Sequence, residues 1–599
     1  MAINPVPGVV NITEFDKSLI ARLISGNTGG VTIPTKKGDD FEATPVFDAD
    51  DAEIKLGRPD PNWSIGRYTI DEFLELGPKM YVKRVTDGSN RIGGIEIKTG
   101  TVPVALSVGL IPAEAGYIFT GISVTDQAFV GSGTGPYINT PSGGEFPIEK
   151  GSISIKDNAV EVATDDGEGN LIGSNIDSAT IDYETGDISI IFLTPPSSPV
   201  TGDFNSDDTI GYLLGINSGA WINGYAIDIE NVNTGPNTGT DRFDIIIYKK
   251  NVDGTYTKAE KHIVSQSQTD KDGNGRTTYG PDVFSRNSKI FQYIDNSSIE
   301  GLPTVTASIT DAAAGLDGGV PSDSDIVLAM DEFISVEQYP DLKIILSAGH
   351  TGVSVANKII SISEIRFFTM FMLDTPNVDA AAAKTYHDDT LGPNTSYGGM
   401  YWPWHVITDK YTGRQVEVPA TGHAVKGFLR DDTKAPAGVR RGSVSSDKLV
   451  YYPTPAEKQD LVDSNINLIL ALPSAGQTVM GQRTLQSFES STSYMNSRRT
   501  LIKIEESLAN FISSYFFEPI NDDTFDAIFV PANNFLGSLG DELEDFRVVI
   551  DETNNNEITK PLRQLVLDTY VILTPDAEEI LLNVTYGASG IKISELVST

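Results

Sequence analysis

The chain contains no cysteine among its 599 residues and only five histidines. Without thiols, the sequence excludes disulfides, zinc–thiolate sites, iron–sulfur clusters and thiol nucleophiles. Basic residues are also few: 44 Lys and Arg stand against 82 Asp and Glu, which gives a net charge of −38. This charge argues against nucleic acid and anionic membranes as partners, because both require a basic face. It favours solubility but makes crowded copies repel one another.

Targeting signals and long apolar runs are missing as well. The first residues, MAINPVPGVVNITEF, have neither a basic region nor a long apolar stretch, so we expect no signal peptide. The longest apolar runs, FFTMFML and INLILALP, have the length of buried strands and fall far short of the ~18 residues of a membrane span. We therefore expect no membrane partner.

Catalytic motifs are absent from the sequence. It has no Gly-Lys dipeptide for a phosphate-binding loop, no His-Glu pair for a zinc-protease helix and no G-x-S-x-G nucleophile elbow. Only generic carboxylates favour the alternative of an acidic carbohydrate hydrolase. The sequence therefore predicts no enzyme activity, no catalytic residue and no cofactor.

Three groups of residues could suggest a metal site. The segment 270–275 matches the start of a calcium-binding loop, with Asp270, Asp272 and Gly275 in place, but Pro281 stands where a bidentate Glu is needed. A solvated acidic hairpin is the favoured interpretation, and calcium binding stays open. For His387 with its two following aspartates, ordinary loop polarity is favoured over a metal. His405 and His423 are expected to be hydrogen-bonded structural residues, so we predict no metal site.

Composition and periodicity predict a mixed α+β multidomain protein. Its parts are an α/β core with a parallel β-α-β unit, a β-rich outward insertion, and extended N- and C-terminal arm strands. The predicted segments are an N-terminal arm (1–30), a first core part (31–97), the β-rich insertion (98–200), a β-rich middle domain (201–340), a second core part with the C-terminal domain (341–579) and a C-terminal arm (580–599).

Local patterns support this division. Residues 101–200 carry 13 acidic and 2 basic residues in short alternating runs, and prolines at 195–199 suggest an exit linker. A strand at 342–347, a helix at 352–362 and a strand at 366–373 predict a parallel pair with a crossover. Thr454 begins a capping box, and an apolar stripe predicts a helix over 494–517. Strands are predicted at 565–573, 580–586 and 591–596.

Nearly ten segments in one order, from residue 7 to about 522, resemble the sheath protein of contractile phage tails. The N-terminal half contributes Pro7-Gly8-Val9, Tyr81-Val82-Lys83-Arg84-Val85 and Gly219-Ala220-Trp221-Ile222-Asn223. The C-terminal half contributes Tyr401-Trp402-Pro403-Trp404, Val418-Pro419-Ala420-Thr421-Gly422, Lys434-Ala435-Pro436-Ala437, Gly481-Gln482-Arg483-Thr484-Leu485, Asn496-Ser497-Arg498-Arg499 and Phe517-Glu518-Pro519. Residues 98–200 match no part of the family, which fits an outward module that varies.

The resemblance implies a structural subunit that polymerises helically around a tail tube. The sheath contracts when the baseplate triggers it and drives the tube through the host envelope for genome delivery. The implied partners are further copies in stacked hexameric rings, the tail tube protein, and baseplate and tail terminator proteins. The implied location is the virion tail, assembled in the host cytoplasm. The sheath of a phage-like injection particle (an R-type bacteriocin) and a β-rich virion adhesin or decoration protein remain alternatives.

In such a family, neighbouring subunits are linked by strands added to a sheet of another subunit. Here the donated strands would be Val9, Val10, Asn11, Ile12 and Thr13 at one end and Ile591, Lys592, Ile593, Ser594 and Glu595 at the other. The receiving sheet would include 565–573.

Residues 401–503 hold 13 basic and 9 acidic residues and are the predicted tube-facing part of the C-terminal domain. Arg498, Arg499 and Lys503 could therefore face an acidic tail tube. Pairing with carboxylates of the same chain is an equally favoured alternative.

Overall fold

The structure is a computed structural model that describes residues 27–578 with internal gaps. The gaps lie at 107–109, 111–121, 129–135, 140–151, 159, 167–168, 182–187, 198–199, 207–208, 234–241 and 297–300. Both predicted linking strands, within 1–26 and 579–599, lie outside the described residues. No helix in the described ranges is both long and apolar enough to cross a membrane.

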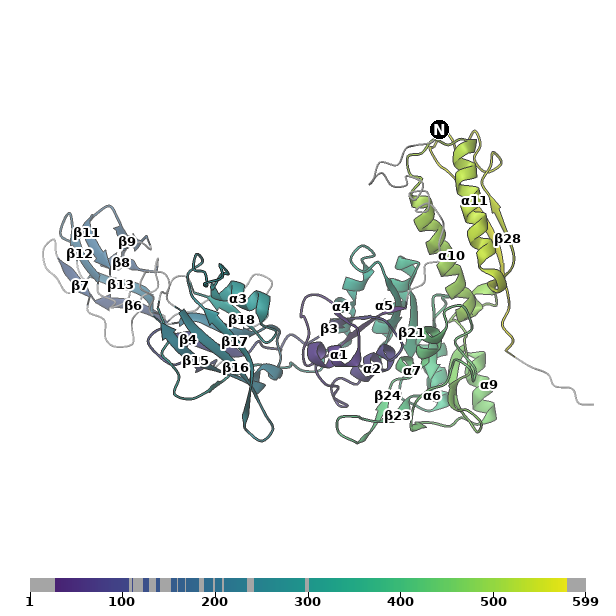
Figure 1. Cartoon of the computed structure of the whole chain (residues 1–599), viewed down its shortest axis with the longest axis horizontal. Helices are drawn as coiled ribbons and strands as arrows, with labels where there is room; N and C mark the ends of the chain where they lie inside the picture. The colour runs from purple at the N-terminus through teal and green to yellow at the C-terminus, as the bar shows by residue number, and fades with distance from the viewer. Residues whose placement is uncertain are drawn as a thin grey trace, which may run out of the picture.

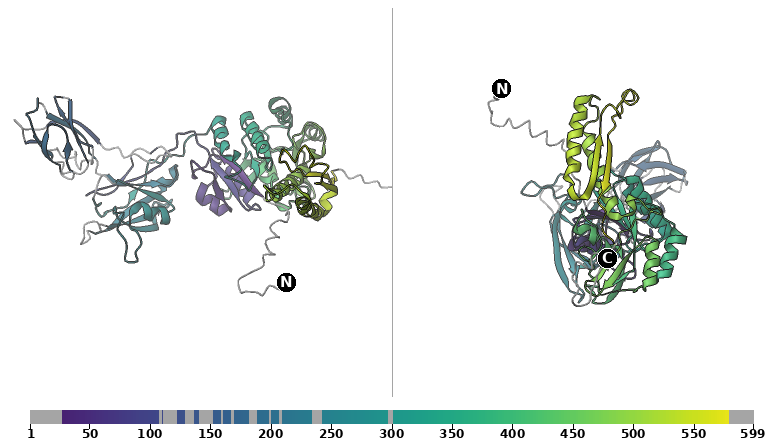
Figure 2. Two further views of the ribbon diagram at one scale, coloured as in Figure 1. Left: turned by 90° about the horizontal axis from the view of Figure 1, so that it is seen from above. Right: turned by 90° about the vertical axis from the view of Figure 1, so that its right-hand side faces the viewer.

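The molecule is elongated, and its parts follow one another along the long axis (Figure 1). A small β module lies at one end, a β-sandwich follows, an α/β core comes next, and a helical module rises from the far side of the core. Figure 2 shows the same succession from above.

An eight-stranded sheet forms the centre of the α/β core, in the order β2-β3-β1-β20-β21-β22-β26-β27. The six inner strands are parallel, and the two edge strands pair antiparallel. Because helices cover both faces, most residues of the inner strands are buried. Their bounds are β1 (Thr28–Ile33), β2 (Thr44–Val46), β3 (Met80–Arg84), β20 (Leu342–Leu346), β21 (Met370–Asp374), β22 (Gly398–Trp402), β26 (Ile466–Leu472) and β27 (Gly476–Val479).

Successive residues of β20 and β21 enter different apolar clusters: Ile344 and Leu346 lie on one face of the sheet, and Ile345 lies on the other. The first face packs against α1 (Ala49–Leu56), α2 (Arg67–Leu74), α7 (Thr421–Ala424), α8 (Lys426–Arg430) and the start of α10 (Met495–Ser513). The second packs against α4 (Asp323–Ala329), η3 (Met330–Ile334), α5 (Val353–Arg366), α6 (Ala380–Thr385) and α9 (Pro455–Asp463).

The ends of two of these helices follow from local chemistry. Thr454 caps α9 in a capping box with Glu457, as the sequence predicts. Ser322 caps α4 in the same way, in a capping box with Asp325. The strand pair β20 and β21 is parallel, and α5 lies between the two strands in sequence.

The β-sandwich consists of the sheets β18-β14-β4-β5 and β17-β16-β15-β19 around one apolar core. Its elements are β4 (Gly94–Lys98), β5 (Val104–Ala105), β14 (Thr209–Gly215), η2 (Ala220–Gly224), β15 (Tyr225–Asn233), β16 (Arg242–Lys250), β17 (Tyr256–Val264), α3 (Gly280–Asn287), β18 (Phe291–Asp295) and β19 (Thr310–Asp311).

The outer β module is inserted between β5 and β14 and has a separate core that includes Ile155 and Ile188. Its sheets are β10-β9-β8-β13-β6 and β11-β12-β7. The strands are β6 (Ile122–Ala128), β7 (Tyr137–Asn139), β8 (Ser154–Asp157), β9 (Val160–Asp165), β10 (Leu171–Ile172), β11 (Ile176–Ile181), β12 (Ile188–Phe192) and β13 (Val200–Ser206). The prolines at 195–199 therefore connect two strands of the module, and the predicted exit linker is wrong.

The remaining elements complete the core and the C-terminal module. A small sheet, β24-β23-β25, lies against α2 and comprises β23 (His405–Thr408), β24 (Gln415–Val418) and β25 (Lys448–Leu449). Single turns are η4 (Tyr386–Leu391), η5 (Ser491–Ser493) and η6 (Gly540–Glu542). The C-terminal module combines α10 with α11 (Asp522–Ser538), β28 (Leu543–Val549) and β29 (Asp568–Leu573).

The structure divides the chain differently from three of the predicted segments. The core sheet begins at Thr28, inside the range assigned to the N-terminal arm. Strand β4 falls in the range of the first core part but pairs within the sandwich. Helix α4 falls in the range of the middle domain but packs on the core. In each case long-range packing, which no local pattern reports, decides where the element belongs.

Candidate assembly interface

The C-terminal module has an apolar core of its own. Helix α10 contributes Ile504, Leu508 and Phe511, and α11 contributes Phe525 and Ile528. Strand β28 packs beside α11, as Figure 1 shows. This packing holds a small sheet on a helical support outside the main core.

Among the residues that the structure describes, the sheet of this module has two strands. β28 and β29 pair antiparallel, from Leu543 opposite Leu573 to Val549 opposite Asp568. Within the described part of the chain, neither strand has a second strand partner. An unpaired strand edge presents N–H and C=O groups that a further strand can bind.

A groove of about 400 Å³ runs beside β29. The end of β29 forms one wall, and residues of α10 and the preceding turn, such as Tyr494 and Leu501, form the other. Successive strand residues point to opposite sides: Val571 packs toward the module core, whereas Tyr570 and Ile572 are 61% and 55% exposed. The groove therefore combines a strand edge with exposed apolar side chains.

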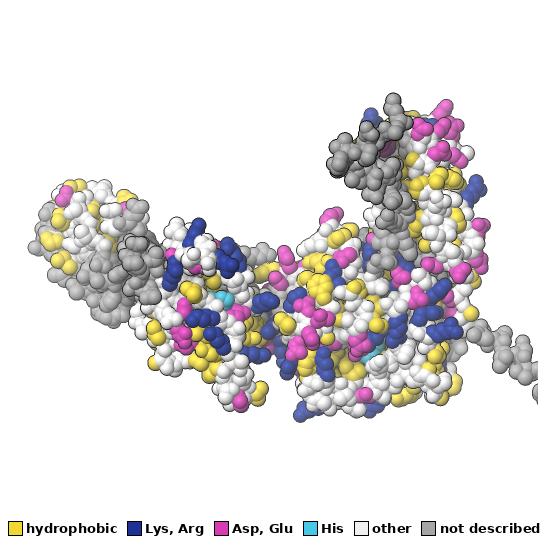
Figure 3. All heavy atoms as spheres, in the orientation of Figure 1, with side chains coloured by type: hydrophobic (Ala, Val, Ile, Leu, Met, Phe, Trp, Pro, Cys, Tyr) yellow, Lys and Arg dark blue, Asp and Glu magenta, His cyan; other side chains and the backbone are white. Residues whose placement is uncertain are grey.

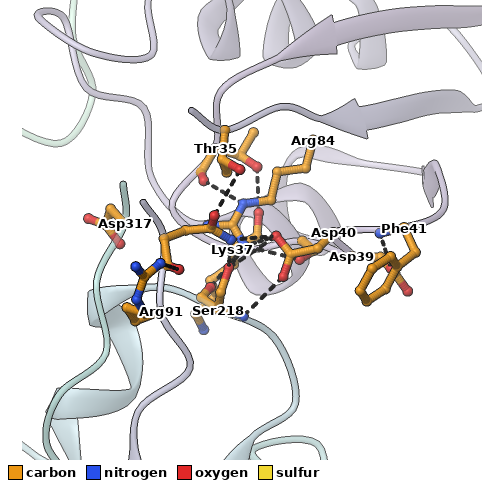
Figure 4. A network of polar contacts seen from close by, with 12 residues as sticks. Thr35, Lys37, Asp39, Asp40, Phe41, Arg84, Arg91, Ser218 and Asp317 are labelled. Carbon is orange, nitrogen blue, oxygen red and sulfur yellow. Dashed lines mark hydrogen bonds and ion pairs between the residues drawn. The ribbon is translucent and has the colours of Figure 1, made fainter. Parts of the chain in front are cut away.

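A buried polar network joins the sandwich to the α/β core (Figure 4). The Arg84 guanidinium, at the end of β3, donates to the Ser218 carbonyl and hydroxyl at 2.9 and 2.7 Å and to Asp40 at 3.1 Å. Asn90 donates to the same Asp40 and Ser218 side chains at 3.1 and 2.7 Å. Burial lowers the pKa of Arg84, and the charge of Asp40 opposes that shift. The network fixes the sandwich, which contains Ser218, against the core.

The three basic residues predicted to face a tube are buried in α10. Arg499 donates to the Asn27 side chain and the Phe428 carbonyl, both at 2.9 Å, and burial lowers its pKa to about 10. Lys503 pairs with Asp432, and Arg498 lies over the Tyr397 ring at 4.0 Å. Each of these residues is at most 8% exposed. This arrangement favours the alternative of pairing within the chain.

Exposed cations lie elsewhere on the surface. On the face drawn in Figure 3, Lys and Arg side chains are spread over the sandwich and the core among Asp and Glu side chains. The charge of the stretch 401–503 therefore does not identify a basic face, because a count along the sequence ignores burial.

His405 and His423 are buried in the core, and the centroids of their rings lie 4.7 Å apart. His423 lies 3.0 Å from the Ser445 carbonyl through Nε2, as a hydrogen-bonded structural residue should. Neither ring nitrogen of His405 has a hydrogen-bond partner in the described part of the chain, so that part of the expectation is wrong for His405. Burial, followed by the charge of Lys426, lowers the pKa of His405 to about 3.

In the calcium-like segment 270–275, the first carboxylate pairs with an arginine from outside the segment. The Asp270 carboxylate accepts from Arg242 Nε and Nη2 at 2.6 and 2.8 Å, and this contact lowers the pKa of Asp270 to about 2. The Asp272 carboxylate accepts from two backbone N–H groups of its own turn. His387 lies in the π-helical turn η4, rather than in the loop that the sequence suggests, with Asp388 2.7 Å away. The described residues contain no group of three or more His, Asp or Glu arranged to hold a metal.

No family model matches the chain. The tail sheath protein of Vibrio phage KVP40 is 24% identical over 377 residues, which are 56% of this chain and 55% of that relative. The resemblance to tail sheath proteins is confirmed. The chain spans about half the length of this curated tail sheath relative.

A solved tail sheath structure extends the likeness in fold over nearly the whole chain. A sheath tail protein from Listeria innocua aligns with a TM-score of 0.50 and 11% identity, covering 94% of this chain and 98% of its own. One from Desulfitobacterium hafniense aligns with a TM-score of 0.47 and 12% identity, covering 92% and 97%. The Listeria protein shares the fold, a mixed α/β multidomain arrangement with several sheets. The curated relative and the Listeria protein are both named as tail sheath proteins, and neither name describes an enzyme.

Proposed function

We propose that this protein is the structural subunit of a contractile phage tail sheath. The observation that carries the proposal is the two-stranded sheet β28–β29 of the described residues, which borders a groove lined by both apolar and polar side chains on a helical support. The similarity to a named phage tail sheath protein supports the same function. In the virion tail, copies polymerise helically, as stacked hexameric rings, around the tail tube.

Strand addition links the copies. Residues Val9–Thr13 of one subunit and 591–595 of another complete the sheet that β28 and β29 begin. An added strand of about five residues makes roughly four backbone hydrogen bonds, each contributing ~0.5–1.5 kcal/mol. One strand therefore contributes only a few kcal/mol, but many such links around and along a helical lattice hold the assembly together.

Contraction is then driven by a change of contacts between subunits and not by a nucleotide. Baseplate opening releases an extended, metastable lattice, and new contacts between subunits drive the tube through the host envelope. The tail terminator closes the other end, and assembly takes place in the host cytoplasm. The buried network around Arg84 supports rigid-body motion, because it prevents the sandwich from turning independently of the core.

Removal of the N-terminal strand tests this function. We expect a chain lacking residues 1–15 to fold as the full chain does but to form no striated tubes by negative-stain microscopy. The matched control is the full-length chain at the same concentration, with circular dichroism of both to compare the folded state. Ordered tubes from the truncated chain would overturn the linking role of the arm.

A further inference from the structure

A polar cavity of about 560 Å³ lies in the core, away from the groove beside β29. It opens between α2 and the small sheet that contains β23, near the base of the core in Figure 1. This volume exceeds that of a few water molecules and falls in the range of small-ligand sites.

Carboxylates dominate the lining of this cavity. Helix α2 contributes Asp71, Glu72 and Glu75, and the segments flanking the small sheet contribute Asp409 and Asp447. Three cations of the same chain neutralise the helical group: Arg67 and Lys410 contact Asp71, and Lys426 contacts both glutamates.

The two carboxylates on the opposite wall have no such partner. Asp409 accepts from the Tyr411 backbone N–H at 3.1 Å and the Thr412 hydroxyl at 2.5 Å, and Asp447 accepts from the Thr408 hydroxyl at 2.6 Å. Neither makes an ion pair with a described residue. Five carboxylates and three cations leave an uncompensated charge of about −2 around the cavity, which favours a cationic occupant.

A buried hydroxyl provides an independent sign of a missing ligand. Tyr68 is only 4% exposed and lines the cavity, and its hydroxyl lies near the Asp409 carboxylate without making a hydrogen bond of good geometry to any described residue. Buried polar groups are nearly always hydrogen-bonded, so an unpaired hydroxyl at a cavity wall indicates a group that binds there. Burial, and then the charge of Asp409, raises the pKa of Tyr68, so the phenol stays neutral and can accept a hydrogen bond from a cation.

The chain's own side chains show which cations this wall accepts. The Lys410 ammonium lies 4.9 Å from the centre of the Tyr411 ring and 3.5 Å from an oxygen of Asp71. The Arg58 guanidinium lies 4.9 Å from the same ring. Ammonium and guanidinium groups therefore both find a carboxylate or an aromatic face here.

We propose that this cavity binds an organic cation that carries ammonium or guanidinium groups. Asp409 and Asp447 neutralise the charge, and the Tyr68 hydroxyl accepts one hydrogen bond. A free polyamine and a Lys or Arg side chain from a second copy share this chemistry. Either source would reduce the self-repulsion of an acidic chain, and the inference does not depend on the proposed sheath function.

Calorimetry with the full chain before assembly tests the site. We expect saturable binding of spermidine or arginine when NaCl keeps the ionic strength constant. Tyr68→Phe and Asp447→Asn should each weaken the affinity at least tenfold, whereas Asp389→Asn, which changes an exposed carboxylate outside the cavity, should leave it unchanged. Heats that do not saturate, or equal affinities for all variants, would overturn the proposal and indicate diffuse counterion attraction.

Assembly distinguishes the two sources of the cation. If a second copy supplies it, Asp447→Asn weakens self-association in sedimentation velocity, and free spermidine competes with that association. If a free polyamine is the ligand, Asp447→Asn loses spermidine binding but associates as the unmodified chain does. If the sheath proposal is wrong, the chain forms no tubes, but spermidine still binds to the unassembled chain in calorimetry. The two proposals can therefore fail independently.

Discussion

At the scale of single residues, Arg84 carries a charge into a site that water barely reaches. Its side chain is enclosed between the end of β3 and the turn after β14, where Nη1 donates to Asp40 and Ser218 while Nη2 has no hydrogen-bond partner among the described residues. The partners lie 44 and 134 positions away in sequence. No spacing in the sequence links them, so this junction could be found only from the folded chain.

Replacing Arg84 with alanine should strongly destabilise the protein. The substitution leaves the largely buried Asp40 carboxylate without its cation, and breaking a buried ion pair costs about 3–5 kcal/mol. Urea unfolding followed by tryptophan fluorescence should show a lower midpoint for R84A. Arg58→Ala is the control, since it breaks the exposed pair with Glu53, which contributes about 1 kcal/mol or less. Equal midpoints for the two variants would show that the buried network does not hold the domains together.

At the scale of elements, local patterns predict what lies close in sequence. The apolar stripe predicts a helix over 494–517, and α10 spans Met495–Ser513. Helix α11 was not predicted, because Pro531 lies inside it and an interior proline normally breaks a helix. The Asn521 side-chain cap and the buried Phe525 and Ile528 indicate it in retrospect.

The sequence likewise predicts one strand of the candidate interface and misses the other. The strand predicted at 565–573 corresponds to β29, Asp568–Leu573. Its partner β28 was not predicted, because the run LEDFRVV mixes charged and apolar residues and becomes a strand through pairing with β29. The burial of Arg498, Arg499 and Lys503 also depends on which helix face meets the core. Sequence counts of charge carry no such information.

Replacing Ile572 with aspartate should prevent assembly without unfolding the subunit. Ile572 is exposed on β29 and lines the groove where a donated strand would lie. A charge there would be buried by the incoming strand, and each copy would lose this contact. We expect no tubes by negative-stain microscopy and a thermal midpoint close to that of the unmodified chain, as exposed substitutions change stability by about 0.5 kcal/mol or less.

Ile558→Asp provides the matched control for this variant. Ile558 is 74% exposed in the same C-terminal module but does not line the groove. This variant should form tubes normally. Tubes from I572D, or equal loss of tubes in both variants, would contradict docking of a strand along β29.

At the scale of the whole molecule, the outer β module is a separable unit. It has its own core and joins the sandwich through the chain after β5 and before β14. Residues 112–206 also carry fourteen acidic and two basic residues, so the module holds −12 of the total charge of −38. In a crowded lattice this charge repels neighbouring copies, and salt screens the repulsion.

Replacing residues 112–206 with a flexible linker should therefore leave a folded protein that assembles at lower salt. Leu110 bridges to Ile92 and Thr209 pairs with Lys98 on opposite sides of β4, so the two ends lie about 10 Å apart across the sheet and about 20 Å along it. A Gly/Ser linker of about twelve residues spans this gap.

Turbidity and negative-stain microscopy over a NaCl series should show tubes at lower salt than the full chain requires. A variant with the module intact and the same linker inserted after Gly254, in the turn between β16 and β17, controls for linker flexibility. An unchanged salt requirement would place the assembly-limiting repulsion in the core, and loss of folding would show that the sandwich needs the module for its own stability.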